Sequence, residues 1–60
     1  MRWNEFIKKI KAKGWRYERP GGRHDIYTHP EKNYPLIVPR HGTAEIKNGL
    51  FNKLKKQAGI

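Results

Sequence analysis

The chain has 60 residues and no cysteine, so one small hydrophobic core must hold its fold. A chain of this length buries at best about 60% of its unfolded surface, and only 35% of its residues are hydrophobic. The missing cysteines exclude a disulfide scaffold, a thiolate zinc site and a cysteine nucleophile. We therefore expect residues 1–60 to form a single domain with no cofactor.

The charge indicates the class of partner. Lys and Arg number 14 against 5 Asp and Glu, which gives a formal net charge of +9. This excess favours a polyanionic partner such as nucleic acid or an acidic protein. No apolar run approaches the ~20 residues that cross a membrane, and the N-terminus lacks the apolar region of a secretory signal. We expect a cytoplasmic protein that does not bind membranes.

Two segments have the apolar spacing of helices. Near the N-terminus, apolar residues recur from Trp3 to Ile10 at intervals of three and four. They predict a helix over about Asn4 to Lys13, with Asn4 as the N-cap and Gly14 after its end. A second helix is predicted near the C-terminus, capped by Asn48 and closed by a Schellman-like end at Gly59 and Ile60. Its expected buried face comprises Leu50, Phe51, Leu54 and Ala58.

Three strands are predicted between these helices. Residues 15–19 alternate aromatic and charged side chains, and residues 23–29 are rich in β-formers. The cluster at 20–22, Pro-Gly-Gly, predicts a turn between them. The apolar run 36–38 is consistent with a third strand, and the two prolines that flank it favour short pairing or an edge position. The order α-β-β-β-α then predicts an α+β fold with two helices on one face of a three-stranded antiparallel sheet, as in double-stranded-RNA-binding domains.

Three histidines, His24, His29 and His41, are the candidate acid–base residues. RNA supplies its own nucleophile in the 2′-OH, so a histidine among cations is sufficient in principle to cleave it without a metal. His24 has the most suggestive context, because it follows two glycines whose backbone N–H groups are able to hold a phosphate. An ordinary hairpin turn and a solvated histidine remain the competing interpretation.

Cations and aromatic residues surround these histidines in the sequence. Arg19 and Arg23 flank the glycine turn, and Arg40 precedes His41. Whether His29, His41 and Arg40 approach His24 is left open by the sequence. A metal site is disfavoured, because His24 and His29 are five residues apart and fall on opposite faces of a strand. Trp15 is expected in the core, whereas the residues open to stacking on bases are Tyr17, Tyr27 and Tyr34.

Several segments together resemble the HicA-type toxins, the small mRNA interferases of type II toxin–antitoxin pairs. The resemblance covers nearly the whole chain. It rests on Lys13-Gly14-Trp15, Gly22-Arg23-His24, Ile26-Tyr27-Thr28-His29-Pro30, Val38-Pro39-Arg40-His41-Gly42, Glu45-Ile46-Lys47, Gly49-Leu50 and Leu54-Lys55-Lys56-Gln57-Ala58-Gly59-Ile60. Family members commonly have serine before the histidine, where this chain has Arg23, so the departure adds a cation beside the catalytic position.

The resemblance implies a fold like that of double-stranded-RNA-binding domains and a metal-independent endoribonuclease that cleaves mRNA and inhibits translation. His24 falls on the family's catalytic histidine. A HicB-type antitoxin would cover the active surface and would itself bind operator DNA, so no direct DNA binding is expected of this chain. The residues expected to contact RNA are Gly22, Arg23, Arg19, Arg40, His41 and His29.

Two other functions remain open. A non-catalytic module of the same fold would recognise double-stranded RNA by shape, although such modules span about 16 base pairs and usually need a longer chain. A small DNA-binding regulator would have to read bases with the second helix. The polar face of that helix offers mostly lysines, with Asn52 and Gln57 as its base-reading candidates.

Overall fold

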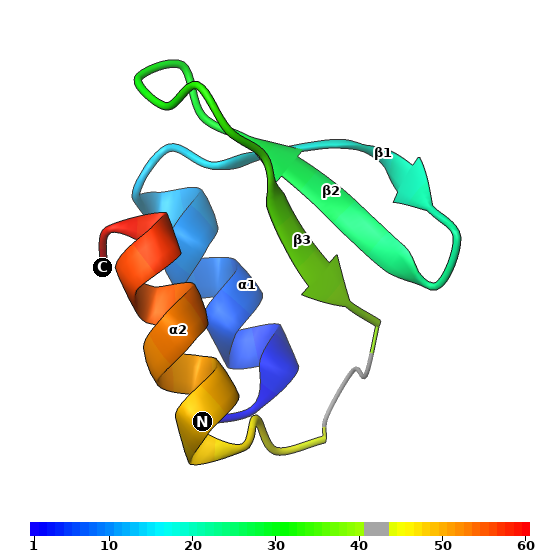
Figure 1. Cartoon of the computed structure of the whole chain (residues 1–60), viewed down its shortest axis with the longest axis vertical. Helices are drawn as coiled ribbons and strands as arrows, with labels where there is room; N and C mark the ends of the chain where they lie inside the picture. The colour runs from blue at the N-terminus through cyan, green and yellow to red at the C-terminus, as the bar shows by residue number, and fades with distance from the viewer. Residues whose placement is uncertain (41–43) are drawn as a thin grey trace.

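The computed structural model describes residues 1–40 and 44–60 and has the element order α-β-β-β-α (Figure 1). The three strands form one antiparallel sheet in the order β1-β2-β3, so the predicted α+β fold is confirmed. Within the described residues, no helix is long and apolar enough to cross a membrane. The elements are α1 (Trp3–Ala12), β1 (Arg16–Gly21), β2 (His24–Thr28), β3 (Leu36–Pro39) and α2 (Asn48–Ala58).

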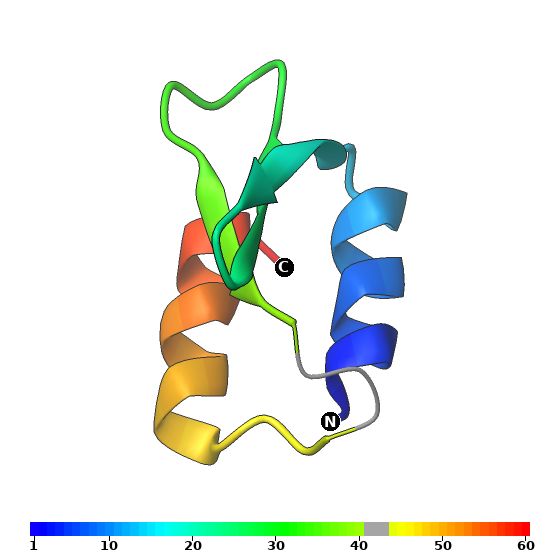
Figure 2. The same ribbon diagram turned by 90° about the vertical axis from the view of Figure 1, so that its right-hand side faces the viewer.

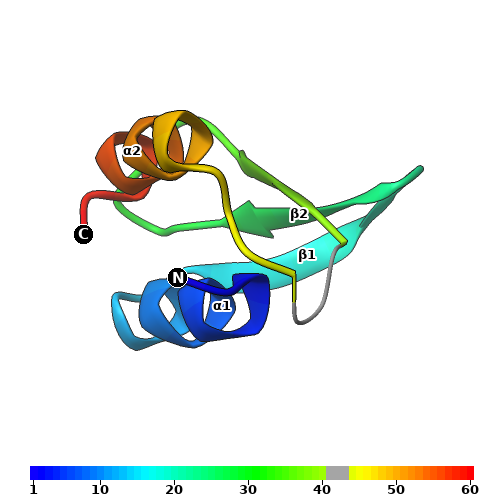
Figure 3. The same ribbon diagram turned by 90° about the horizontal axis from the view of Figure 1, so that it is seen from below.

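The strand register separates an inner face of the sheet from an outer one. Tyr27 pairs with Leu36 on the inner face, and both are buried against the helices. Ile26 pairs with Ile37 on the outer face, where Ile37 is 44% exposed. The two helices therefore share one face of the sheet, as Figures 2 and 3 illustrate, and the outer face has no covering element among the described residues. The buried core consists of Trp3, Phe6, Ile10, Trp15, Tyr27, Leu36, Val38, Ile46, Leu54 and Ala58.

Trp15 joins the core to the end of α2. Its side chain is 1% exposed, as expected of a core residue, and its indole N–H donates to the carbonyl of Ala58 at 2.9 Å. The hydroxyl of Tyr34 donates to the carbonyl of Gln57 at 2.7 Å. A helix leaves its last four carbonyls without helical partners, and these two bonds satisfy the final pair.

The other two carbonyls at this end accept from the backbone. Gly59 adopts φ +73° and donates to the carbonyls of Lys55 and Lys56, while Ile60 donates to that of Lys55. This is the hydrogen-bond pattern of a Schellman motif, so the predicted end of the second helix is confirmed. All four terminal carbonyls of α2 thus have partners, which fixes the end of the helix against Trp15 and the 29–35 loop.

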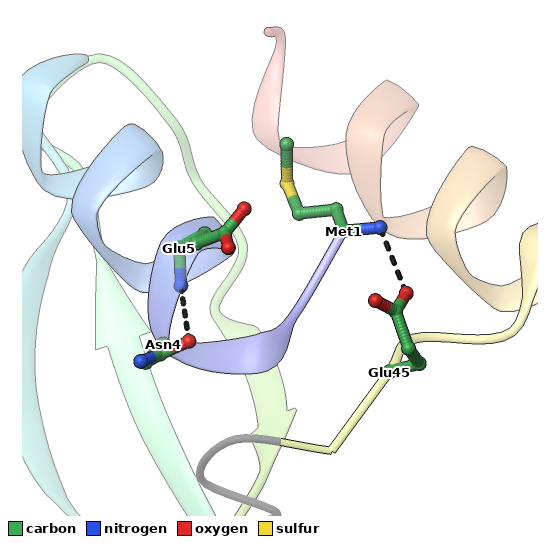
Figure 4. Close-up of polar contacts among 4 residues, drawn as sticks. All are labelled: Met1, Asn4, Glu5 and Glu45. Carbon is green, nitrogen blue, oxygen red and sulfur yellow. Dashed lines mark hydrogen bonds and ion pairs between the residues drawn. The ribbon is translucent and has the colours of Figure 1, made fainter.

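The predicted caps of both helices are wrong by one or two positions. Arg2 caps α1, and the Asn4 side chain instead accepts from the N–H of Glu5 at 2.9 Å. The cause is tertiary, because residues 1–3 pair with residues 44–46 and this pairing holds Arg2 extended. Figure 4 shows the ion pair that accompanies it, between the N-terminal ammonium and Glu45 at 3.0 Å. In α2 the cap is Lys47 rather than Asn48, again without a side-chain hydrogen bond.

The first strand is longer than the sequence predicts. It continues through Pro20 and Gly21, and the turn contains only Gly22 and Arg23. Because β1 lies at the sheet edge, the missing N–H of Pro20 is tolerated there. Gly22 has φ +66° and Arg23 does not have a positive φ, which is the pattern of a type II′ hairpin turn. Gly22 therefore meets a backbone requirement of the turn, two residues before His24.

Candidate functional site

His24 is the first residue of the central strand. It pairs with Gly21 of β1 and with Pro39 of β3, and it shares the outer face with Ile26 two residues later. Its side chain is exposed. Among the residues that the structure describes, none forms a hydrogen bond or ion pair with its imidazole. As far as residues 1–40 and 44–60 are concerned, both ring nitrogens are therefore open to a ligand.

The turn before His24 is open to solvent. The tip of the β1–β2 hairpin projects beyond both helices (Figure 1), and Arg23 at this tip is exposed. A Cβ atom added to Gly22 would meet no described atom within 4 Å, so a ligand is able to approach the backbone closely. The structure thus places Gly22, Arg23 and His24 together on an accessible corner of the sheet.

A groove of about 350 Å³ begins at His24 and runs between β3 and α2. Its volume lies within the range of about 300–1,000 Å³ that is typical of ligand pockets. Ile37 and Pro39 line it from the sheet. From α2 come Leu50, Lys53, Leu54 and Gln57.

The sequence interpretation missed the contribution of Lys53 and Gln57 to this groove. The signal was present, because the four α2 residues that line the groove have the i, i+3, i+4, i+7 spacing of one helix face. Leu50 and Leu54 were instead attributed to the core, and Lys53 and Gln57 to the polar face of the helix. The assignment is wrong for Leu50, which is 39% exposed, whereas Leu54 and Ala58 are buried as predicted.

A second hollow, of about 480 Å³, continues across the outer face. It shares Pro35 and Ile37 with the first groove, so the two are continuous. Arg19 lines this hollow and pairs with Ile26, which makes it a diagonal neighbour of His24 at a Cα separation of about 7–8 Å. The Arg19 guanidinium lies 3.5 Å from Glu18, and both side chains are exposed, so the pair is weak. Lys32 and Asn33 complete the polar lining opposite Arg19.

Arg40 does not join this cluster. It binds Asp25 at 2.7 Å, and Asp25 faces away from His24 because successive strand residues point to opposite faces. This ion pair borders a separate pocket beside Lys8 and Lys11 of α1. The structure thus separates Arg40 from His24 by the thickness of the sheet.

Tyr27 is a core residue on the inner face of the sheet, the face to which Asp25 also points. Its side chain is 4% exposed, so the role in base stacking that the sequence left open for it is wrong. Burial raises the pKa of Tyr27 above 10.0, and the charges of Asp25 and Tyr17 raise the pKa further. Tyr17 and Tyr34 keep exposed ring surface at the margins of the fold.

His29 lies at the opposite end of β2, five residues or about 16 Å from His24. Its Nε2–H donates to the carbonyl of Lys13 at 2.8 Å, and its Nδ1 accepts from the N–H of Glu31 at 3.0 Å. The ring also packs edge-on against Trp15 at 5.3 Å. Both nitrogens are therefore occupied by backbone groups, which gives His29 a role in the fold.

His41 lies outside the described residues. Within residues 1–40 and 44–60, no three His, Asp or Glu side chains come close enough to hold a metal ion. The site that the structure assembles from the predicted residues thus comprises His24, Gly22, Arg23 and Arg19.

Comparison with known proteins identifies the family to which this site belongs. Residues 3–60 match the family described as "HicA toxin of bacterial toxin-antitoxin". No curated protein matches the chain. The family match covers nearly the whole chain, including both helices and all three strands. The chain therefore belongs to the HicA toxin family of bacterial toxin–antitoxin systems.

Proposed function

We propose that this toxin is an endoribonuclease that cleaves mRNA with His24 and so inhibits translation. The observation that carries the proposal is the His24 imidazole, which is exposed at the mouth of a groove and has no described partner. Imidazole exchanges protons near neutral pH, so a free ring beside bound RNA is suited to acid–base catalysis. The net charge of +9 favours binding of the substrate polyanion.

The reaction we propose needs no metal. The 2′-oxygen of a ribose attacks the adjacent phosphorus and forms a P–O2′ bond, while the P–O5′ bond breaks. The 2′-hydroxyl releases one proton and the departing 5′-oxygen takes one up, so the products are a 2′,3′-cyclic phosphate and a 5′-hydroxyl. His24 would transfer one of these protons as general base or general acid, and solvent water would transfer the other.

Phosphate binding would come from the groups beside His24. The backbone of Gly22 is open to a phosphate, and Arg23 adds a cation at the adjacent position. Arg19 lies on the same face of the sheet, where the outer hollow would hold the next part of the RNA strand. Arg40 and His29 lie outside this path, so we assign neither of them to the cleaved phosphate.

The antitoxin would be a HicB-type protein that covers the groove. An acidic surface would be complementary to the excess of cations, and exposed apolar groups such as Ile37 and Leu50 would become buried beneath it. Binding at this place would inhibit the toxin by excluding RNA from His24. Operator DNA would be bound by the antitoxin.

The test is cleavage of a single-stranded transcript by the purified toxin and by His24→Ala. We expect His24→Ala to lose cleavage by at least about 100-fold while it keeps the circular dichroism spectrum and the antitoxin affinity of the wild type. Cleavage by the wild type should persist in EDTA. Full activity of His24→Ala would refute the assignment of His24. A wild type that retards RNA without shortening it would favour the binding-module alternative.

A further inference from the structure

The groove that His24 lines also has a cationic side chain, on the wall that α2 forms. Lys53 of α2 is exposed and lines the same groove as His24. In the described part of the chain, no ion pair or hydrogen bond involves its ammonium group. We propose that Lys53 binds the phosphate to be cleaved and stabilises the charge that develops on it. The proposal rests on the cleavage reaction assigned to His24.

The distribution of acidic residues makes this groove selective for anions. None of the acidic residues lines it among the described contacts, and Asp25, the one nearest to His24 in sequence, lies on the other face with Arg40. The charge of Lys53 is therefore not neutralised by the protein. The walls are largely apolar, because Ile37 and Leu50 line them.

The orientation of α2 distinguishes Lys53 from its neighbours in sequence. Buried Leu54 and Ala58 fix the rotation of the helix against the core. With 3.6 residues per turn, residues two apart lie on nearly opposite sides of a helix. Lys55 accordingly points away from the groove, and its ammonium lies 6.0 Å from the ring of Phe51. Lys55 is also exposed and therefore offers a control with the same charge on the same helix.

A cation at this position would assist the proposed step. As the 2′-oxygen attacks, the non-bridging oxygens of the five-coordinate phosphorus gain negative charge. A fixed cation accelerates such a step when it interacts more strongly with the transition state than with the bound substrate. Lys53 would remain protonated throughout and would exchange no proton, so its part is electrostatic and separate from that of His24.

The experiment measures cleavage at saturating toxin, with affinity measured separately on a 2′-deoxy analogue of the same transcript. Lys53→Gln should lower the saturated rate by about tenfold or more, whereas Lys55→Gln should leave this rate within about twofold. Both variants lose one charge, so both should lower the affinity for the analogue, and Lys53→Gln should lower it more because Lys53 binds the phosphate. Lys53→Arg, which keeps the charge, should recover most of the rate. Unchanged melting temperatures would confirm that the variants are folded.

Each outcome decides one of the two proposals. Equal saturated rates for Lys53→Gln and Lys55→Gln would overturn the role of Lys53, even with His24→Ala inactive. A rate that Lys53→Arg fails to recover would also count against an electrostatic role. Full cleavage by His24→Ala would instead overturn the assignment of His24 and, with it, the basis for Lys53. The two failures are therefore distinguishable in one set of assays.

Discussion

Gly14→Ala should destabilise the toxin through His29. Gly14 has φ +102°, and a Cβ atom placed there would lie 2.8 Å from Nε2 of His29. Left-handed backbone costs an L-residue about 1–2 kcal/mol. Displacement of His29 would also break its two hydrogen bonds, to the Lys13 carbonyl and from the Glu31 N–H, at about 0.5–1.5 kcal/mol each.

The sum of these costs is about 2–5 kcal/mol, which is large for a chain this short. Domains have about 0.05–0.15 kcal/mol of stability per residue, so 60 residues give about 3–9 kcal/mol. Gly14→Ala should therefore lower the urea midpoint strongly or leave part of the protein unfolded in water. Urea unfolding followed by circular dichroism measures the change.

A double-mutant cycle separates the backbone cost from the clash. In a His29→Ala background there is no ring to displace, so Gly14→Ala should cost only the backbone part of about 1–2 kcal/mol. The difference between the two backgrounds, about 1–3 kcal/mol, is the coupling between Gly14 and His29. Equal costs in both backgrounds would refute this reasoning and would leave the His29 ring free for another role.

Two further predictions use the same unfolding measurement. Gly59→Ala should lower the free energy of unfolding by only about 1–2 kcal/mol. The residue has φ +73°, but the atom nearest to an added Cβ, Nζ of Lys32, would lie at an ordinary contact distance of 3.7 Å. A larger loss of stability than in Gly14→Ala would contradict this prediction. The wild type should lose stability at alkaline pH through ionisation of Tyr27, and Tyr27→Phe should remove this loss. Because the folded pKa of Tyr27 is raised above 10.0, this contribution is complete below pH 10.0 and is lost as pH rises through the folded pKa. An unchanged slope of melting temperature against alkaline pH in Tyr27→Phe would contradict it.

Local patterns predicted the elements of this fold well. The spacing from Trp3 to Ile10 and from Phe51 to Ala58 produced both helices, and the flanking prolines correctly placed β3 at an edge. The caps were wrong because Arg2 is held by pairing with Glu45, which is 43 residues away in sequence. Contacts over that distance leave no periodic signal.

The candidate site was predictable only in part. His24, Gly22 and Arg23 are adjacent in sequence, so the hairpin brings them together without help from the rest of the fold. Whether Arg40 approaches His24 was left open by the sequence, because the place of Arg40 depends on the register between β2 and β3 and on the ion pair with Asp25. A shift of one residue in a strand exchanges its two faces, and the sequence does not specify the register to that accuracy.

The sequence by itself determined the order of the elements and the family of the chain, and it predicted a polyanionic partner and His24 as the acid–base residue. Charge, periodicity and a local motif carry that information, because each depends on composition or on near neighbours. Of the two histidines that the structure describes, the tertiary structure decided which has free ring nitrogens. The ring nitrogens of His29 bind backbone groups of Lys13 and Glu31, while His24 lines a groove together with Lys53. That distinction arises from packing between distant segments, since α2 forms a wall of the groove only after the core has fixed its rotation.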